Sequence, residues 1–263
     1  MESITANFTW IVSLKQGFSH KGRGNMKVFG VIALIGSLFV MGCASKLPTY
    51  RFLLTVDVET PEGLRSGSSV IEVMTSDQGK GFPGPEAGGI RTQSRGEAVA
   101  VDLPGEQVLF LLFNADWAGE VMPRVNPDIL YGDGTFEQKL NAIIARREPI
   151  PLPRHFSHRF PPPSSEQASP SAYPRMVTFA DLDDPTSVEL VNPDDLAASF
   201  GEGVKLKRIT VQITEAPVTT GIEKRLVWLG EYPEPSLDPV RGPKDFSLAA
   251  TLHHGDFRWG VMK

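Results

Sequence analysis

Residues 50–63 read Tyr-Arg-Phe-Leu-Leu-Thr-Val-Asp-Val-Glu-Thr-Pro-Glu-Gly, and this stretch predicts a strand that runs into a turn. Apolar side chains occupy alternate positions, the period of a half-buried strand: Phe52, Leu54, Val56 and Val58. Thr60–Gly63 has the proline and glycine that are typical of turns. Ser68–Thr75 then predicts the returning strand, so the fold begins with an antiparallel hairpin.

Further strands are predicted at Glu97–Leu103, Val108–Phe113, Met176–Phe179, Ser187–Val191 and Val204–Thr214. Val108–Phe113 is apolar throughout, which is typical of a central strand that is covered on both faces. In the last strand the apolar phase changes near Lys207 and Arg208, which predicts either a bulge or a sheet edge at these residues. Residues 76–96 predict a loop. Phe246–Leu252 and Phe257–Val261 predict a terminal hairpin.

Three segments have helical signals. Thr135–Arg147 has an apolar stripe and the Thr135/Gln138 spacing of a capping box. Asn192 begins a short helix that ends near Gly201, and Thr220 begins another that ends at Gly230. Because strands follow one another without intervening helices, the sequence predicts a strand-dominated α+β fold with mostly antiparallel sheet and two or three short helices.

A proline-rich stretch divides the chain. Pro149–Pro174 contains eight prolines, which exclude helix and sheet interiors. We therefore expect a β-rich lobe with a helix at residues 50–148, a linker or surface loop at 149–175, and an α+β lobe at 176–263.

Cys43 is the only cysteine, and it directly follows Val40-Met41-Gly42. The uncharged run Val28–Met41 has 14 residues, too few for a helix to cross a bilayer core of about 30 Å. Lys27 precedes the run, so residues 26–42 have the layout of a signal peptide. Met26 is then the expected start of translation, and residues 1–25 are either not translated or are removed together with the signal peptide.

Val40–Cys43 resembles the lipobox of bacterial lipoproteins. The resemblance implies that Cys43 becomes the mature N-terminus, carries acyl chains such as palmitate and anchors the protein at the cell envelope. Ala44 follows in place of an inner-membrane retention signal, so the resemblance favours the outer membrane. Residues 43–49 form a short lipidated tether that would keep the domain near the bilayer. Tyr50–Phe52, Thr60–Gly63 and Pro217–Leu226 are also similar to proteobacterial proteins of unassigned function.

The net charge and the composition exclude some classes of binding partner. The chain has a formal charge of −5, which becomes −8 without residues 1–42. An acidic domain without a basic stripe argues against nucleic acid and against electrostatic docking on anionic lipid. The sequence contains neither a Walker motif nor a dinucleotide fingerprint, and no cofactor is expected.

Candidate metal ligands are few. His155 and His158 are three residues apart in the proline-rich stretch, and His253 and His254 are adjacent in a predicted turn. The acids Asp181, Asp183 and Asp184 lack the glycine and glutamate of a calcium loop. Exposed loop histidines and a solvated turn account for these residues, so no metal site is assigned.

Two functional hypotheses remain open. The first is a membrane-anchored binding or assembly module that contacts an envelope protein. Five aromatic residues are candidates for exposed recognition residues, although most of them are expected to lie in the core: Trp117, Phe160, Tyr173, Trp228 and Trp259. The alternative is an envelope hydrolase that draws its acids from Asp57, Glu59, Glu72 and Asp102. Because nucleophile motifs are absent from the sequence, no catalytic residue is assigned and the binding module is preferred.

Overall fold

The computed structural model divides the chain into two units, Met1–Cys43 and Ala44–Lys263. The structure describes residues 45–77, 89–156, 171–230, 233–238 and 246–260, all within the second unit. The predicted signal peptide, Cys43, His158 and Phe160 lie outside the described residues. In the described ranges, no helix has the length and apolar character that are needed to cross a membrane.

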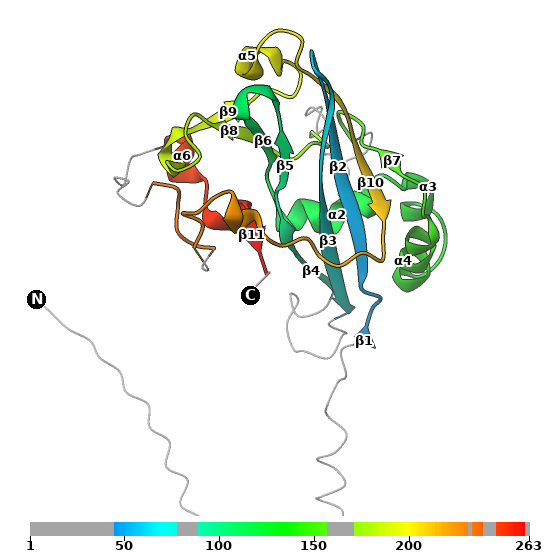
Figure 1. The fold of residues 1–263 in the computed structure, drawn as a ribbon. Helices are drawn as coiled ribbons and strands as arrows, with labels where there is room; N and C mark the ends of the chain where they lie inside the picture. Colours follow the sequence, from blue (N-terminus) through cyan, green and yellow to red (C-terminus); the bar gives the residue numbers. More distant parts are fainter. Residues whose placement is uncertain (1–44, 78–88, 157–170, 231–232, 239–245, 261–263) are drawn as a thin grey trace, which may run out of the picture. The chain divides into compact units, whose positions relative to one another are not determined.

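The larger sheet has seven strands (Figure 1). They are β1 Ser45–Lys46, β2 Tyr50–Thr60, β3 Gly63–Asp77, β4 Ile90–Glu97, β7 Ile150–Pro151, β10 Lys205–Ile213 and β11 Arg258–Trp259. Their order is β11-β4-β3-β2-β10-β7, and β1 pairs with the end of β3. The predicted hairpin is confirmed, with Phe52 opposite Ile71 in an antiparallel ladder.

The smaller sheet has four strands, β5 Val99–Asp102, β6 Val108–Leu111, β8 Met176–Phe179 and β9 Val188–Val191. β6 lies between β5 and β8, and its residues are all buried, as the apolar run predicts. The two sheets approach at Gly67 of β3, where an added Cβ would lie 2.1 Å from the carbonyl oxygen of Ala100. Any side chain at Gly67 would therefore push the sheets apart.

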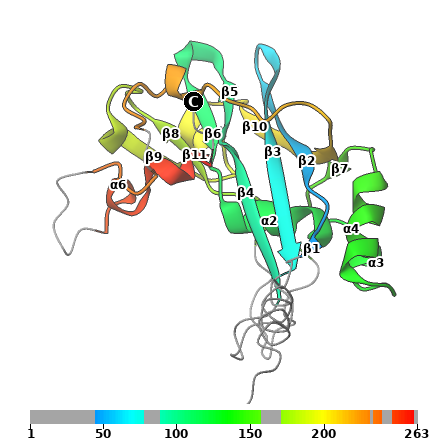
Figure 2. The same ribbon diagram turned by 90° about the horizontal axis from the view of Figure 1, so that it is seen from below.

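The helices are short: α2 Ala115–Arg124, α3 Pro127–Leu130, α4 Phe136–Ala145, α5 Ala197–Phe200 and α6 Leu248–Thr251. Figures 1 and 2 show α2 crossing one face of the larger sheet at β3 and β4, where the Ser94 hydroxyl donates to the Ala115 carbonyl. Helix α4 has the predicted capping box between Thr135 and Gln138. Together with the two antiparallel sheets, these helices confirm the strand-dominated α+β class.

Of the two alternatives for the phase change near Lys207 and Arg208, the structure has the bulge, because the register of β10 against β2 shifts between Leu206 and Arg208. Strands from before and after the proline-rich stretch share both sheets: β10 pairs with β2, and β8 pairs with β6. The stretch at 149–175 therefore does not coincide with a boundary between sheets. Both of its described ends pack on the core, the first through Leu152 and Phe156 and the second through Ala172.

One helix is shorter than predicted: the segment expected to begin at Asn192 is helical only in α5, where Leu196 rather than Asn192 occupies the N-cap position. Three further local predictions were wrong. Residues 76–96 are not one loop, since β3 continues to Asp77 and β4 begins at Ile90. The helix expected at 220–230 is only the 3₁₀ turn η3 Ile222–Lys224. The terminal hairpin is replaced by α6, the 3₁₀ turn η4 His254–Asp256 and β11, which pairs with β4. In each case a tertiary partner outweighs the local pattern.

The segment at 220–230 shows how a tertiary partner does this. The buried Glu97 carboxylate accepts hydrogen bonds from the backbone N–H groups of Gly221 and Ile222, at 3.2 and 3.0 Å. These contacts take the place of the predicted Thr220 cap. Ile222, Leu226 and Leu229 remain buried, because the apolar spacing suits a packed turn as well as a helix.

Candidate functional site

Two adjoining hollows lie where β6 ends and α2 begins. The first has a volume of about 510 Å³ and is lined by Asn114, Asp116, Pro233, Glu234, His253 and Trp259, among others. The second has a volume of about 310 Å³ and is lined by Trp117, Tyr173, Arg175 and Leu252, among others. Both share Phe113, Asn114 and Asp256, and we refer to the pair as the aromatic cleft.

The part of the cleft lining at the start of α2 is held by one local capping bond and one long-range hydrogen bond. Asn114 is the N-cap of α2, and its side-chain oxygen accepts from the Trp117 backbone N–H at 2.8 Å. The Trp117 indole N–H donates to the Ala172 carbonyl at 2.9 Å, and its ring meets Phe52 edge-on. The indole is therefore fixed at the border of the core with one edge in the cleft.

The opposite wall is η4. The Asp256 carbonyl accepts from the Phe113 N–H at 2.7 Å, and its carboxylate accepts from the His253 N–H at 2.7 Å. The first bond holds the Asp256 backbone against the chain that follows β6, and the second caps the η4 turn locally. Gly255 lets Pro233 and Trp259 pack close to the backbone, because an added Cβ would lie 3.0 and 3.1 Å from them.

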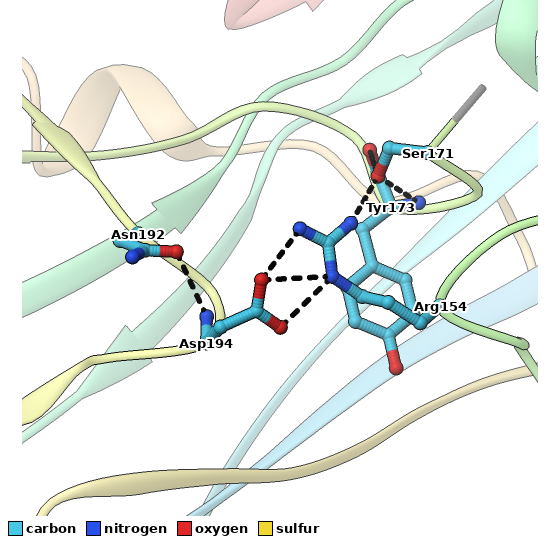
Figure 3. A network of polar contacts seen from close by, with 5 residues as sticks. All are labelled: Arg154, Ser171, Tyr173, Asn192 and Asp194. Carbon is cyan, nitrogen blue, oxygen red and sulfur yellow. Dashed lines mark hydrogen bonds and ion pairs between the residues drawn. The ribbon is translucent and has the colours of Figure 1, made fainter. Parts of the chain in front are cut away.

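A network of polar contacts positions Tyr173, which lines the second hollow (Figure 3). The Arg154 guanidinium donates to both carboxylate oxygens of Asp194 and to the Ser171 hydroxyl. The same guanidinium lies 5.3 Å from the centre of the Tyr173 ring. Since Arg154 precedes the segment 157–170 and Ser171 follows it, the network joins the two described ends of the proline-rich stretch. The Arg154 hydrogen bond holds the pKa of Asp194 below its ordinary value.

The aromatic cleft is acidic on one side. Asp116, Glu234 and Asp256 line the first hollow, and among the residues that the structure describes no lysine or arginine does. Asp116 and Glu234 are exposed, and neither forms an ion pair with any residue that the structure describes. Trp259 is 45% exposed beside them. The arrangement presents negative charge next to an aromatic face that a ligand can reach.

Of the proposed recognition aromatics, Trp117 and Tyr173 line the second hollow and Trp259 lines the first. Trp228 has a structural position: its indole N–H donates to the Leu182 carbonyl, and its ring packs on Phe179 and Phe257. The structure thus brings three of the five aromatics to one place. Sequence reasoning missed Asn114, Asp116, Glu234 and Asp256.

The histidines are not brought together as a metal site. His253 lines the first hollow, whereas the neighbouring His254 ring accepts from the Gly230 N–H and packs on Trp228. Burial lowers the pKa of His254, so its ring is neutral near pH 7. His155 forms an isolated bridge with Ser171. Across the part of the chain that the structure describes, no three His, Cys, Asp or Glu residues are grouped so as to hold a metal ion.

The three acids considered for calcium, Asp181, Asp183 and Asp184, lie in a local turn. The Asp181 carboxylate accepts from the Asp183 N–H, and the Asp184 carboxylate accepts from the backbone and hydroxyl of Thr186. Asp184 is the N-cap of the 3₁₀ turn η2 Pro185–Ser187. These bonds fix the turn before β9.

The acids of the hydrolase hypothesis lie on strands, and each pairs with a different basic residue. The pairs are Asp57–Arg208 at 2.7 Å, Glu59–Lys207 at 3.0 Å, Glu72–Arg95 at 2.7 Å and Asp102–Arg225. Burial raises the pKa of Asp57, but the Ser66 hydroxyl and Arg208 outweigh it, so the pKa lies below its ordinary value. The Arg225 hydrogen bonds lower the pKa of Asp102. Asp57 and Asp102 are thus poor proton donors.

Comparisons of the chain with known protein families, with curated proteins and with solved structures found no match. Function is therefore inferred from the chemistry of the site.

Proposed function

We propose that the folded domain is a non-catalytic binding module, anchored by lipid on Cys43 at the periplasmic side of a bacterial envelope membrane, with the outer membrane favoured. The aromatic cleft is its binding surface for an envelope protein. The observation that carries this proposal is the convergence of Trp117, Tyr173 and Trp259 on two adjoining hollows. Aromatic side chains supply large contact area at low entropic cost, so they dominate many recognition sites.

The chemistry of the first hollow favours a basic group on the partner. Asp116, Glu234 and Asp256 line it, and no lysine or arginine from the described part of the chain lines it with them. A lysine or arginine side chain there would face carboxylates and the Trp259 ring, which suits both a salt bridge and a cation–π contact. A short peptide segment with one basic residue is the ligand that fits these features.

Photo-crosslinking in intact cells tests the cleft. A benzophenone amino acid replaces Trp259 in one variant and Leu190 in the other, because Leu190 is also exposed, at 61%, but lies on β9 outside the cleft. We expect a discrete crosslinked product from position 259 and none from position 190. Adding Asp116→Asn and Glu234→Gln should weaken that product. Equal products at both positions, or no product at 259, would contradict the proposal.

The anchor is tested separately. Cys43→Ser should move the protein from the membrane fraction to the soluble fraction, because a short apolar segment alone binds membranes only weakly. Mass spectrometry of the wild-type N-terminal peptide should show acyl mass on Cys43. A Cys43→Ser variant that resists carbonate extraction would show that lipidation is not the anchor.

A further inference from the structure

The sheet begins almost immediately after the proposed lipid. Ser45 is the first residue of β1 and is paired with Asp77, at the C-terminal end of β3. Cys43 precedes Ser45 by two residues, a span of at most about 7 Å of extended chain. The headgroup layer of one leaflet is itself only about 5–8 Å thick. The lipid therefore leaves the paired end of the sheet no room to move away from the membrane surface.

We propose that this end of the seven-stranded sheet is the membrane-facing surface, where β1, the C-terminal end of β3 and the N-terminal end of β4 contact lipid headgroups. The inference rests on the lipidation of Cys43 proposed above and adds which face of the domain meets the bilayer. Figure 1 shows β1 at one end of the sheet and the turn between β2 and β3 at the other.

The side chains at this end suit a headgroup layer. Ile90 starts β4 opposite Asp77 and is 41% exposed. Arg91 follows, exposed and without an ion pair to any residue in the described ranges. An exposed aliphatic side chain gains by entering the interface, and a guanidinium binds phosphate oxygens in a bidentate manner. One arginine orients the domain; the lipid supplies the attachment.

The opposite end has a different character. Gly63 and Asp77 bound β3, so the hairpin turn lies up to about 46 Å from the lipid-proximal end along the strand. Leu64 is exposed there at 51%, but the neighbouring Arg65 is paired with Glu62. Leu64 and Ile90 are thus matched exposed aliphatic residues at opposite ends of one sheet.

This orientation sets the height of the aromatic cleft. The first residue of α2 is bonded to Ser94, four residues along β4 from Ile90, which corresponds to about 13 Å. A partner segment in the cleft would then lie close to the membrane surface. The surface contact and the partner contact use different residues.

Headgroup quenching tests the orientation. Ile90→Cys and Leu64→Cys are made separately in the full chain, labelled with a small fluorophore, and reconstituted in phosphatidylethanolamine–phosphatidylglycerol vesicles. In the lipidated protein the Cys43 sulfur is a thioether, so each new thiol is the only one to react. We expect several-fold stronger quenching at position 90 than at 64 by a lipid with a spin label on its headgroup. Equal quenching, or stronger quenching at 64, would overturn the proposal.

Flotation and a second label complete the design. If the wild-type protein does not float with the vesicles, the lipid anchor itself fails, and the orientation fails with it. If it floats but the labels quench equally, only the orientation fails. Arg91→Cys repeats the measurement at the same end, and strong quenching there is expected. Circular dichroism must match wild type for each variant, since a displaced β4 would also quench.

Discussion

The described domain holds two groups of carboxylates that differ in their partners. One group, the partnered acids, lies on the sheets: Asp57, Glu59, Glu72, Glu97 and Asp102. The other group, the cleft acids, consists of Asp116 and Glu234, which line the aromatic cleft without an ion pair to a described residue. A carboxylate that already accepts hydrogen bonds from a basic side chain or a backbone N–H holds structure, whereas one that faces a hollow beside Trp259 is available to a ligand.

The difference also shows why acidic residues in a sequence are weak evidence of catalysis. A general acid needs a raised pKa, and arginine partners at Asp57 and Asp102 lower it. Glu97 is the exception, because burial raises its pKa, but two backbone N–H groups occupy its oxygens. The following changes test whether the two groups behave as this division requires.

The largest effect is expected at Glu97, which is 2% exposed. Glu97→Ala removes the acceptor for the Gly221 and Ile222 N–H groups and leaves a buried cavity. We expect a loss of roughly 2–4 kcal/mol in the free energy of unfolding, measured by urea titration. Glu97→Gln keeps one acceptor oxygen and should lose less. An unchanged midpoint for Glu97→Ala would mean that the η3 turn does not depend on this carboxylate.

The next largest effect on the free energy of unfolding is expected at Asp57. Its carboxylate accepts from the Ser66 hydroxyl at 2.6 Å and from Arg208 at 2.7 Å. Asp57→Ala should cost about 1–3 kcal/mol, because both partners lose an acceptor, although the half-exposed Arg208 can turn to water. Asp57→Asn keeps the shape and the Ser66 bond and serves as the control. A loss of partner crosslinking in Asp57→Asn, with stability retained, would break the division between the two groups.

The strands that pattern alone specifies were predicted well. The alternation in β2, the continuous apolar run in β6 and the phase change in β10 all reflect side-chain burial, which a sequence encodes directly. The capping box of α4 is equally local. These features require no knowledge of what packs against them.

The cleft required long-range information. Asp116 and Trp259 are 143 positions apart in the sequence and meet because β11 pairs with β4 beside the start of α2. Asn114 and Asp116 did carry a local signal, an N-cap followed by an acid in the first turn. Glu234 carries none, since only tertiary contacts bring the loop before α6 to the cleft. For the same reason, the local sequence pattern could not predict the Glu97 contact that replaces the 220–230 helix.

The pH dependence of stability should separate two of the partnered acids by sign. The pKa of Asp57 is lowered in the folded state, so the unfolded state binds more protons; its stabilisation is present above about pH 4 and is lost as the pH falls through the folded pKa. Glu97 has a raised pKa, so the folded state binds the proton first and stability from this group grows as the pH falls.

Melting temperatures between pH 7 and pH 3 measure both signs. The difference in melting temperature between wild type and Asp57→Asn should shrink as the pH falls. Over the same range the melting temperature of wild type should rise relative to that of Glu97→Gln. Parallel curves for all three proteins would show that neither carboxyl changes its proton affinity on folding. Arg208→Gln provides a further control, because it should abolish most of the Asp57 effect while leaving that of Glu97.

The smallest effect on stability is expected from the cleft acids, and it is the sharpest test of the comparison. Asp116→Asn and Glu234→Gln remove charge from exposed groups that hold no described partner, so each should change the free energy of unfolding by less than about 0.5 kcal/mol. Asp116 does complement the α2 dipole, which accounts for a few tenths of a kcal/mol. The double variant should nevertheless weaken the photo-crosslink at position 259, and the weakening should be greatest at low salt, where charge attraction is least screened.

A matched double variant, Glu59→Gln with Glu215→Gln, removes two exposed charges outside the cleft and should leave the crosslink unchanged. If both double variants reduce the crosslink equally, net charge rather than the cleft attracts the partner. If the cleft variant destabilises the fold by more than about 1 kcal/mol, the cleft acids belong with the partnered ones.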